Sequence, residues 1–230
     1  MDLKRISIVV PVLNEEKQLP RILDLQNRAI NVEVIIVDGG SYDRTLDRAI
    51  ESGAKIIQSD PGRARQMNAG AAIATGEILL FLHADTQLPD QFDAMIRATL
   101  SQAETIAGAF KLKIAADLPG IRFVERGVNW RSRFLQFPYG DQAIFLRTQT
   151  FVQIGGFPKL PIMEDFELVR QLRRSGKIKI LPVPVTTSGR RWQKFGVLQT
   201  TIVNQLVIVA YLLGVSTERL DRWYRTGLKR

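Results

Sequence analysis

The chain has 230 residues, of which 45% are hydrophobic, so it is long enough to bury the core of one large domain and too apolar to be disordered. It has no cysteine, which excludes disulfides, thiolate metal sites and cysteine nucleophiles. The 32 Lys and Arg residues exceed the 23 Asp and Glu residues and give a net charge of +9. This balance favours anionic partners such as nucleic acid, an acidic membrane surface or phosphorylated substrates.

The first hundred residues alternate between short apolar runs and longer mixed segments. The expected strands are 6–12, 32–37, 55–58 and 78–82, and the expected helices are 16–29, 44–52, 64–74 and 88–101. Ser41 and Asp43 are candidate N-caps for the second helix. Repeated strand–helix alternation predicts an α/β fold, with a mostly parallel sheet flanked by helices.

The pattern changes after residue 103. Strands are expected at 107–115, 143–146 and 178–185, and helices at 121–134, 151–154 and 165–175. Pro182 and Pro184 cannot donate ladder hydrogen bonds, which predicts that the last strand lies at a sheet edge. We expect one domain over residues 1–195, followed by a helical tail over residues 196–230.

The tail contains the most apolar stretch of the chain, at 197–215. Five polar residues interrupt its first half, whereas a bilayer span needs about 20 mostly apolar residues, so we expect an amphipathic helix instead. This helix has three expected placements, namely on the domain, in a homodimer surface or on an anionic membrane. Met1 lies close to the first strand, which predicts a cytoplasmic protein that is at most peripheral on the inner face of the cell membrane.

Acidic residues stand at the ends of the predicted strands. Asp38 closes one apolar run, Asp85 closes another, and the pair Glu164-Asp165 follows far downstream. Ligands of open α/β sheets bind beyond the carboxyl ends of the strands. Because grouped carboxylates are costly unless a cation or a ligand uses them, we expect Asp38, Asp85 and Asp165 to surround one cavity that holds a metal-bound nucleotide diphosphate.

Four segments resemble the ordered motifs of family 2 glycosyltransferases, which have the GT-A fold. They are IVVPVLNE at 8–15, VDGGS at 37–41, HAD at 83–85 and ED at 164–165. GRARQMNAG at 62–70 and SGRRW at 188–192 resemble a smaller subgroup, associated with arsenosugar biosynthesis and compared with diaponeurosporenoate glycosyltransferases. The resemblance implies inverting transfer of a sugar from a nucleotide-diphosphate donor to an acceptor hydroxyl.

The resemblance also implies residues for the donor. Those expected to bind the nucleotide are Pro11, Asn14, Glu15, Asp38, Arg63, Arg65, Asn68 and Ala84. Asp38 would accept the N3–H of uracil, which favours a UDP-linked sugar. Its Asp-Gly-Gly-Ser context also suits a turn or a cap, but its place at a strand end favours the ligand site. Guanidinium groups near a helix start favour phosphate. Small residues at 68 and 70 would let this helix approach the nucleotide closely.

For the chemistry, the resemblance implies Asp85 as the ligand of Mn²⁺ or Mg²⁺. His83 replaces the first acid of the usual Asp-x-Asp motif, and it would bind the metal, contact the ribose or simply pack. Asp165 matches the general base, with Glu164 beside it to position the acceptor or to tune the base, and both also suit a helix start.

The remaining candidates lie near the acceptor or the leaving diphosphate. They are Asp141, Arg190, Arg191 and Trp192. The last three resemble the end of the Gln-x-x-Arg-Trp motif of polymer-forming members, but the Gln is missing. This departure favours a single small or lipid-like acceptor, with an arginine stabilising the diphosphate.

Two other functions remain open. A nucleotidyltransferase acting on a sugar phosphate also uses strand-end carboxylates and Mg²⁺, but it needs a glycine-rich loop where this chain has PVLNEE at 11–16. A basic nucleic-acid-binding protein is supported by charge alone, and no specific nucleic-acid partner is expected.

Overall fold

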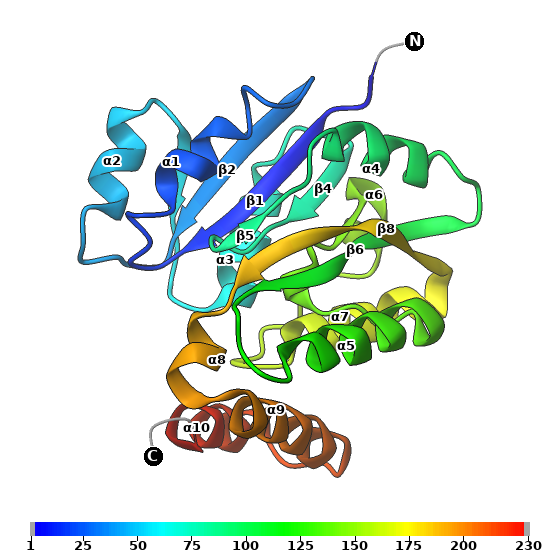
Figure 1. Ribbon diagram of the computed structural model, residues 1–230. Coiled ribbons are helices and arrows are strands. Elements are labelled where there is room, and N and C mark those ends of the chain that lie inside the picture. Colours follow the sequence, from blue (N-terminus) through cyan, green and yellow to red (C-terminus); the bar gives the residue numbers. More distant parts are fainter. Residues whose placement is uncertain (1–2, 228–230) are drawn as a thin grey trace.

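The computed structural model describes residues 3–227. Its centre is an eight-stranded sheet in the order β3-β2-β1-β4-β7-β6-β8-β5, with helices against both faces (Figure 1). Alternate residues of the first strand enter different cores: Ile8 and Val10 pack with α1, α2 and α4, whereas Val9 packs with α3, α6 and α7. The expected layered α/β fold is confirmed.

The first half of the sheet is parallel. Its strands are β1 (Ile6–Val12), β2 (Val32–Asp38), β3 (Lys55–Gln58) and β4 (Ile78–Phe81). The connecting helices are α1 (Leu19–Asp24), α2 (Thr45–Glu51) and α3 (Arg63–Ala72). Because all four strands point the same way, their carboxyl ends meet at one edge, as the positions of Asp38 and Asp85 predict.

The second half is mixed. It contains β5 (Thr86–Gln87), α4 (Phe92–Leu100), β6 (Thr105–Ala115), α5 (Ile121–Leu135), a 3₁₀ turn (Gly140–Gln142), β7 (Phe145–Arg147), α6 (Thr148–Gln153), α7 (Glu164–Ser175) and β8 (Lys177–Ser188). Strand β7 runs antiparallel to both β4 and β6, whereas β8 is parallel to β6. The sheet therefore reverses direction next to β4.

Strand β8 is the next-to-last strand, not the edge strand that its prolines predict. The unexpected two-residue β5 pairs with Thr186 and Thr187, on the far side from β6. Pro182 lies where the register between β6 and β8 shifts, between the pairs Phe110–Leu181 and Lys111–Pro184. The irregularity accommodates the prolines that a regular ladder would exclude.

The expected helix at 16–29 is reduced to the six residues of α1. Pro20 stands in its first turn, where the missing N–H costs nothing. The preceding residues are held differently, because the N–H groups of Asn14 and Glu15 donate to the hydroxyls of Ser41 and Thr45. Side chains from the start of α2 thus fix the loop after β1 and delay the helix.

The tail forms three helices, α8 (Arg190–Phe195), α9 (Val197–Leu212) and α10 (Thr217–Gly227), and Figure 1 shows α9 and α10 below α5. Val207 of α9 and Leu220 of α10 are buried in the same core as α7. The outer face of α9 is also apolar, unlike that of the expected amphipathic helix. No helix within residues 3–227 has the length and apolar character of a membrane span. Residues 228–230 of the expected tail lie outside the described range.

Candidate active site

Helix α3 fixes the ends of the first strands. The buried side chain of Gln66 donates to the carbonyls of Val12 and Val37, at 2.9 and 2.8 Å. A Cβ on Gly70 would lie only 2.4 Å from a methyl carbon of Val9. The expectation that Gly70 approaches a nucleotide is therefore wrong, because the glycine lets α3 approach the sheet.

The carboxylate of Asp38 is hydrogen-bonded within the turn that follows β2. Asp38 is fully buried and accepts hydrogen bonds from the N–H of Gly40 and from both the N–H and the hydroxyl of Ser41. Asn14 joins this region by accepting the N–H of Tyr42. Of the two readings of Asp38, the structure shows the turn, and Asp38 does not line the cavity described below.

Four other predicted nucleotide residues also have structural partners. The amide of Asn68 both donates to and accepts from the backbone of Phe157. Arg65 forms an exposed ion pair with Asp60, at 3.8 Å. Pro11 is buried within β1, and the carbonyl of buried Ala84 accepts a hydrogen bond from Arg21. None of these four lines the cavity.

A cavity of about 520 Å³ lies beside the residues that directly follow β4. Eight of the residues named from the sequence line it, namely Arg63, His83, Asp85, Asp141, Asp165, Arg190, Arg191 and Trp192. Residues from α3, the loop after β4, α7 and α8 thus converge, although they are up to 129 positions apart in the sequence. Two of the three acids expected in one cavity are present, namely Asp85 and Asp165.

The loop before β7 holds Asp165 in place. One oxygen of its carboxylate accepts the N–H of Gly140 at 2.7 Å, and the other accepts the N–H of Phe166. A Cβ on Gly140 would lie 3.0 Å from Nε2 of His83 and 3.2 Å from Oδ2 of Asp165. Gly140 therefore lies close to both His83 and Asp165, and two backbone N–H groups, one from this loop and one from α7, orient the carboxylate.

Arg63, which lines the cavity, forms a partly buried ion pair with Glu164. Nε of Arg63 lies 2.9 Å from Oε1 of Glu164, whose side chain is 2% exposed. The second oxygen, Oε2, has no hydrogen-bond partner among the described residues. Burial raises the pKa of Glu164, against the opposing charge of Arg63, and the negative charge of Asp165 raises it further.

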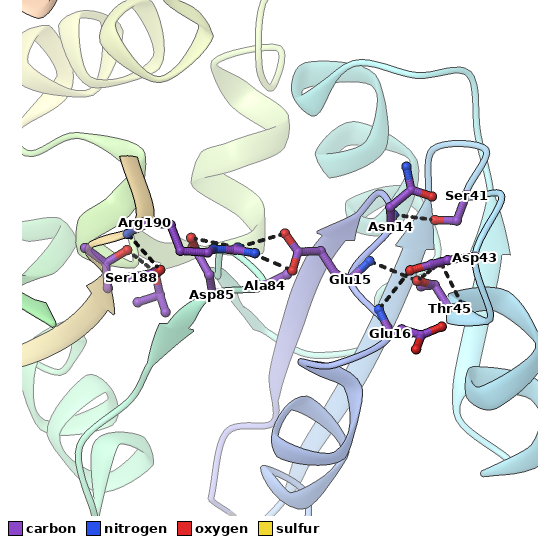
Figure 2. A network of polar contacts seen from close by, with 12 residues as sticks. Asn14, Glu15, Glu16, Ser41, Asp43, Thr45, Ala84, Asp85, Ser188 and Arg190 are labelled. Carbon is purple, nitrogen blue, oxygen red and sulfur yellow. Dashed lines mark hydrogen bonds and ion pairs between the residues drawn. The ribbon is translucent and has the colours of Figure 1, made fainter. Parts of the chain in front are cut away.

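Arg190 joins the tail to two strand ends. Its Nη2 lies 3.1 Å from Oε1 of Glu15 and 3.4 Å from Oδ2 of Asp85, and Figure 2 shows the guanidinium between these carboxylates. The backbone N–H of Arg190 donates to Ser188. The predicted nucleotide residue Glu15 is therefore connected to the cavity through an arginine of α8.

The enclosed charges shift two further groups. Burial, together with the positive charge of Arg63, lowers the pKa of His83 to about 4, so the imidazole is neutral near pH 7. Burial raises the pKa of Asp141 to about 6, despite the opposing charge of Arg131. Oδ1 of Asp141 is buried and has no partner within residues 3–227.

Sequence reasoning missed two groups beside Asp141. The guanidinium of Arg131 lies 3.4 Å from the ring centroid of Tyr139, and Tyr139 lines the cavity. Gln142 positions this loop by donating to the carbonyl of Phe110 and accepting from Ser132. The only sequence signal was the basic character of α5, which does not reveal which arginine turns inward. Several tail residues that line the cavity were missed as well.

The residues present fit a metal that is bound together with a substrate. Within the described part of the chain, no group of three or more His, Cys, Asp or Glu side chains is placed to hold an ion. The carboxylate of Asp85 nevertheless faces the cavity and is a hard oxygen ligand. Mg²⁺ is commonly held by one or two carboxylates and completed by substrate phosphates, which is the arrangement that Asp85 can support.

Comparison with known proteins identifies related sequences. The family model "Glycosyl transferase family 2" matches residues 7–157. A PGL/p-HBAD biosynthesis glycosyltransferase of Mycobacterium tuberculosis is 31% identical over 218 residues, which are 86% of this chain and 80% of the relative. A 4,4'-diaponeurosporenoate glycosyltransferase of Staphylococcus haemolyticus is 34% identical over 108 residues, which are 42% of this chain but only 29% of that protein.

Solved structures agree on the fold. The mannosyltransferase PcManGT of Pyrobaculum calidifontis, in complex with GDP-Man and Mn²⁺, gives a TM-score of 0.66 at 17% identity over 98% of this chain and 69% of its own. S. aureus TarS in complex with UDP gives 0.64 at 19% identity over 98% and 71%. The fold is therefore GT-A. Because the family model covers more than half of the chain, the protein belongs to glycosyl transferase family 2.

Proposed function

We propose that the protein is an inverting glycosyltransferase that moves a sugar from a nucleotide diphosphate, UDP in the first instance, to the hydroxyl of a small or lipid-like acceptor. The observation that carries this proposal is the convergence of Asp85 and Asp165 with Arg63, Arg190 and Arg191 on one cavity. Carboxylates for a metal and a base, beside cations for a diphosphate, are the parts that such a reaction needs.

In this proposal Asp165 is the general base. Its carboxylate is fixed by the N–H groups of Gly140 and Phe166, and it keeps lone pairs to accept the proton of an acceptor hydroxyl. The deprotonated oxygen attacks the sugar carbon from the side opposite the leaving diphosphate. Glu164 pairs with Arg63 and holds this lining residue in place.

The arginines stabilise the departing diphosphate. Arg190 already balances the carboxylates of Glu15 and Asp85, and the diphosphate would compete for its guanidinium. Asp85 would hold Mn²⁺ or Mg²⁺, which supplies positive charge for the leaving group when bound. The family match favours this reaction over nucleotidyl transfer and over nucleic-acid binding.

A panel of nucleotide diphosphates tests the donor. TarS was solved with UDP and PcManGT with GDP-Man, so UDP, GDP, CDP and ADP are compared in thermal unfolding, each with and without Mn²⁺. A ligand at about 100 times its Kd adds about 2.7 kcal/mol to the free energy of unfolding. We expect UDP with Mn²⁺ to stabilise most. If no nucleotide stabilised the protein, the proposal would be abandoned.

We also propose peripheral attachment to an anionic membrane. The outer face of α9 exposes Leu198 and Leu206, and Leu213, which directly follows the helix, is 79% exposed. On α5, the guanidinium groups of Arg126 and Arg133 lie over the exposed rings of Phe123 and Phe134. Exposed apolar groups beside cations suit the surface of an anionic bilayer, and the surrounding positive charge opposes pairing with a second copy.

Flotation with phosphatidylglycerol vesicles tests this attachment. The double variant Leu206→Glu/Leu213→Glu is expected to lose binding. Val152→Glu is the matched control, because Val152 is 70% exposed on α6, away from α5 and α9. Equal flotation of all three proteins would contradict the attachment. A concentration-dependent dimer that only the double variant disrupts would assign the face to a homodimer.

A further inference from the structure

The cavity has two chemically different halves. Its charged half contains the proposed catalytic groups. The other half is apolar and contains Met163 and Phe166 at the start of α7, together with Phe195, Val207, Ile208 and Tyr224 from the tail. The diphosphate and the sugar of the donor are polar, so these two parts of the donor match the charged half.

The apolar wall is built into the fold. Tyr211 of α9 packs its ring edge-on against Phe166 at 5.6 Å, and its hydroxyl donates to Oε1 of Glu167 at 2.7 Å. Leu220 of α10 is completely buried in the same core. Helices α9 and α10 are therefore anchored to α7, the helix whose first turn carries Asp165.

One face of α9 is turned to the cavity. Asn204, Val207 and Ile208 line it and are spaced at i, i+3 and i+4, which places them on the same side of a helix. The exposed residues Leu206 and Val209 point elsewhere and do not line the cavity. The apolar residues on the inner side of α9 therefore both pack against the core and form part of the cavity wall.

The wall begins next to the reacting position. Phe166 directly follows the proposed base, and Arg191 of the charged half has its guanidinium 4.0 Å from the ring centroid of Tyr224. An acceptor whose hydroxyl reaches Asp165 would therefore place the rest of its body against Phe166 and the tail. Water left against that wall would be displaced favourably by an apolar group.

We propose that helices α8–α10 form the acceptor subsite, and that the acceptor is an alcohol or phenol whose hydroxyl is attached to an apolar body. This inference rests on the proposed glycosyl transfer and names the acceptor class for the same site. The shared chemistry is a hydroxyl on an apolar group, whether aromatic or isoprenoid.

The test measures binding of 4-butylphenol, farnesol and glycerol to the full chain loaded with Mn²⁺ and its best nucleotide diphosphate. The variant Ile208→Asn places an amide in the apolar wall. Val209→Asn is the matched control, because the neighbouring side chain is 51% exposed and does not line the cavity. Phe195→Ala is a second wall variant on a different helix, and circular dichroism verifies that each variant is folded.

We expect wild-type protein to bind at least one of the two apolar probes and not glycerol. Preference for the phenol or for farnesol identifies an aromatic or an isoprenoid acceptor. Ile208→Asn should weaken that binding about tenfold or more and leave nucleotide affinity unchanged, and Phe195→Ala should weaken it as well. Val209→Asn should match wild type.

Two results would overturn the subsite. They are equal weakening by Ile208→Asn and Val209→Asn, or absence of probe binding by a protein that still binds its nucleotide with Mn²⁺. Loss of nucleotide binding in the wild type is a different outcome, because it removes the proposed glycosyl transfer itself.

Discussion

The turn after β2 and the cavity beside β4 both contain buried carboxylates, but they use them differently. In the turn, Asp38 accepts three hydrogen bonds from the two residues Gly40 and Ser41. In the cavity region, Oδ1 of Asp141 and Oε2 of Glu164 have no partner among residues 3–227. Buried polar groups are normally paired, so the turn is complete by itself, whereas the cavity is organised for a ligand.

The largest expected effect comes from removing the base. Asp165→Asn keeps the size of the side chain and the acceptor for the Gly140 N–H, but it removes the group that takes the proton. We expect kcat to fall by about 100- to 10,000-fold. Steady-state kinetics with the identified donor and acceptor measure this change.

The control for this variant is Asp60→Asn, because the side chain of Asp60 is 82% exposed and pairs only at the surface with Arg65. It should retain wild-type turnover. Wild-type turnover by Asp165→Asn would remove this residue from its assigned role.

The next largest effect on kcat is expected from Arg190, which lines the cavity, in comparison with Arg65, which does not. Arg190 contacts Glu15 and Asp85 beside the cavity, whereas Arg65 forms an exposed pair with Asp60. Arg190→Ala should lower kcat by about 100-fold, because a cation aimed at the leaving diphosphate is lost. Arg65→Ala should leave the kinetics unchanged. Equal losses in both variants would indicate a general effect of net charge.

The variant Asp38→Ala is expected to change the stability of the protein but not its nucleotide preference. Asp38→Ala leaves the buried donors of Gly40 and Ser41 unpaired, so we expect the free energy of unfolding to fall by about 1–3 kcal/mol, measured by urea denaturation. The nucleotide preference of the folded variant should be unchanged. An altered preference for UDP, without loss of stability, would instead assign Asp38 to base recognition.

The smallest effect is a pH dependence from Asp141. Burial raises its pKa to about 6, so the folded protein binds this proton more tightly than the unfolded chain does. The stabilisation is complete below about pH 4 and is lost as the pH rises through about 6, with an upper limit of about 3 kcal/mol.

Asp141→Asn removes this titration. Its stability relative to wild type should therefore increase as the pH rises from about 4 to about 6.5, in urea denaturation at a series of pH values. A difference between the two proteins that is independent of pH would contradict the assignment.

Local patterns predicted the strands and the convergence of Asp85 with Asp165. The apolar runs before Asp38 and Asp85 are long enough to be recognised, and parallel strands bring their ends together. The order of the family motifs then placed Asp165 at the same edge. These features depend only on neighbouring residues and on the rule that parallel strands end at the same edge of a sheet. They can therefore be predicted from a single sequence.

Long-range packing could not be predicted in the same way. The loop before α1 is held by hydrogen bonds that the N–H groups of Asn14 and Glu15 donate to Ser41 and Thr45, more than 25 positions further along the chain. Asn68 has a polar amide of the kind that can bind a ligand, but this amide donates to the backbone carbonyl of Phe157. The two sides of α9 are both apolar, so hydrophobicity alone does not say which one lines the cavity.

The most direct measurement of the central claim is calorimetric binding of UDP, with Mn²⁺ and with EDTA, to wild type, Asp85→Asn and Asp60→Asn. If Asp85 and the diphosphate share a metal in this cavity, Mn²⁺ strengthens UDP binding to wild type and to Asp60→Asn, and this dependence disappears in Asp85→Asn. A Mn²⁺ dependence that Asp85→Asn retains in full would contradict the account.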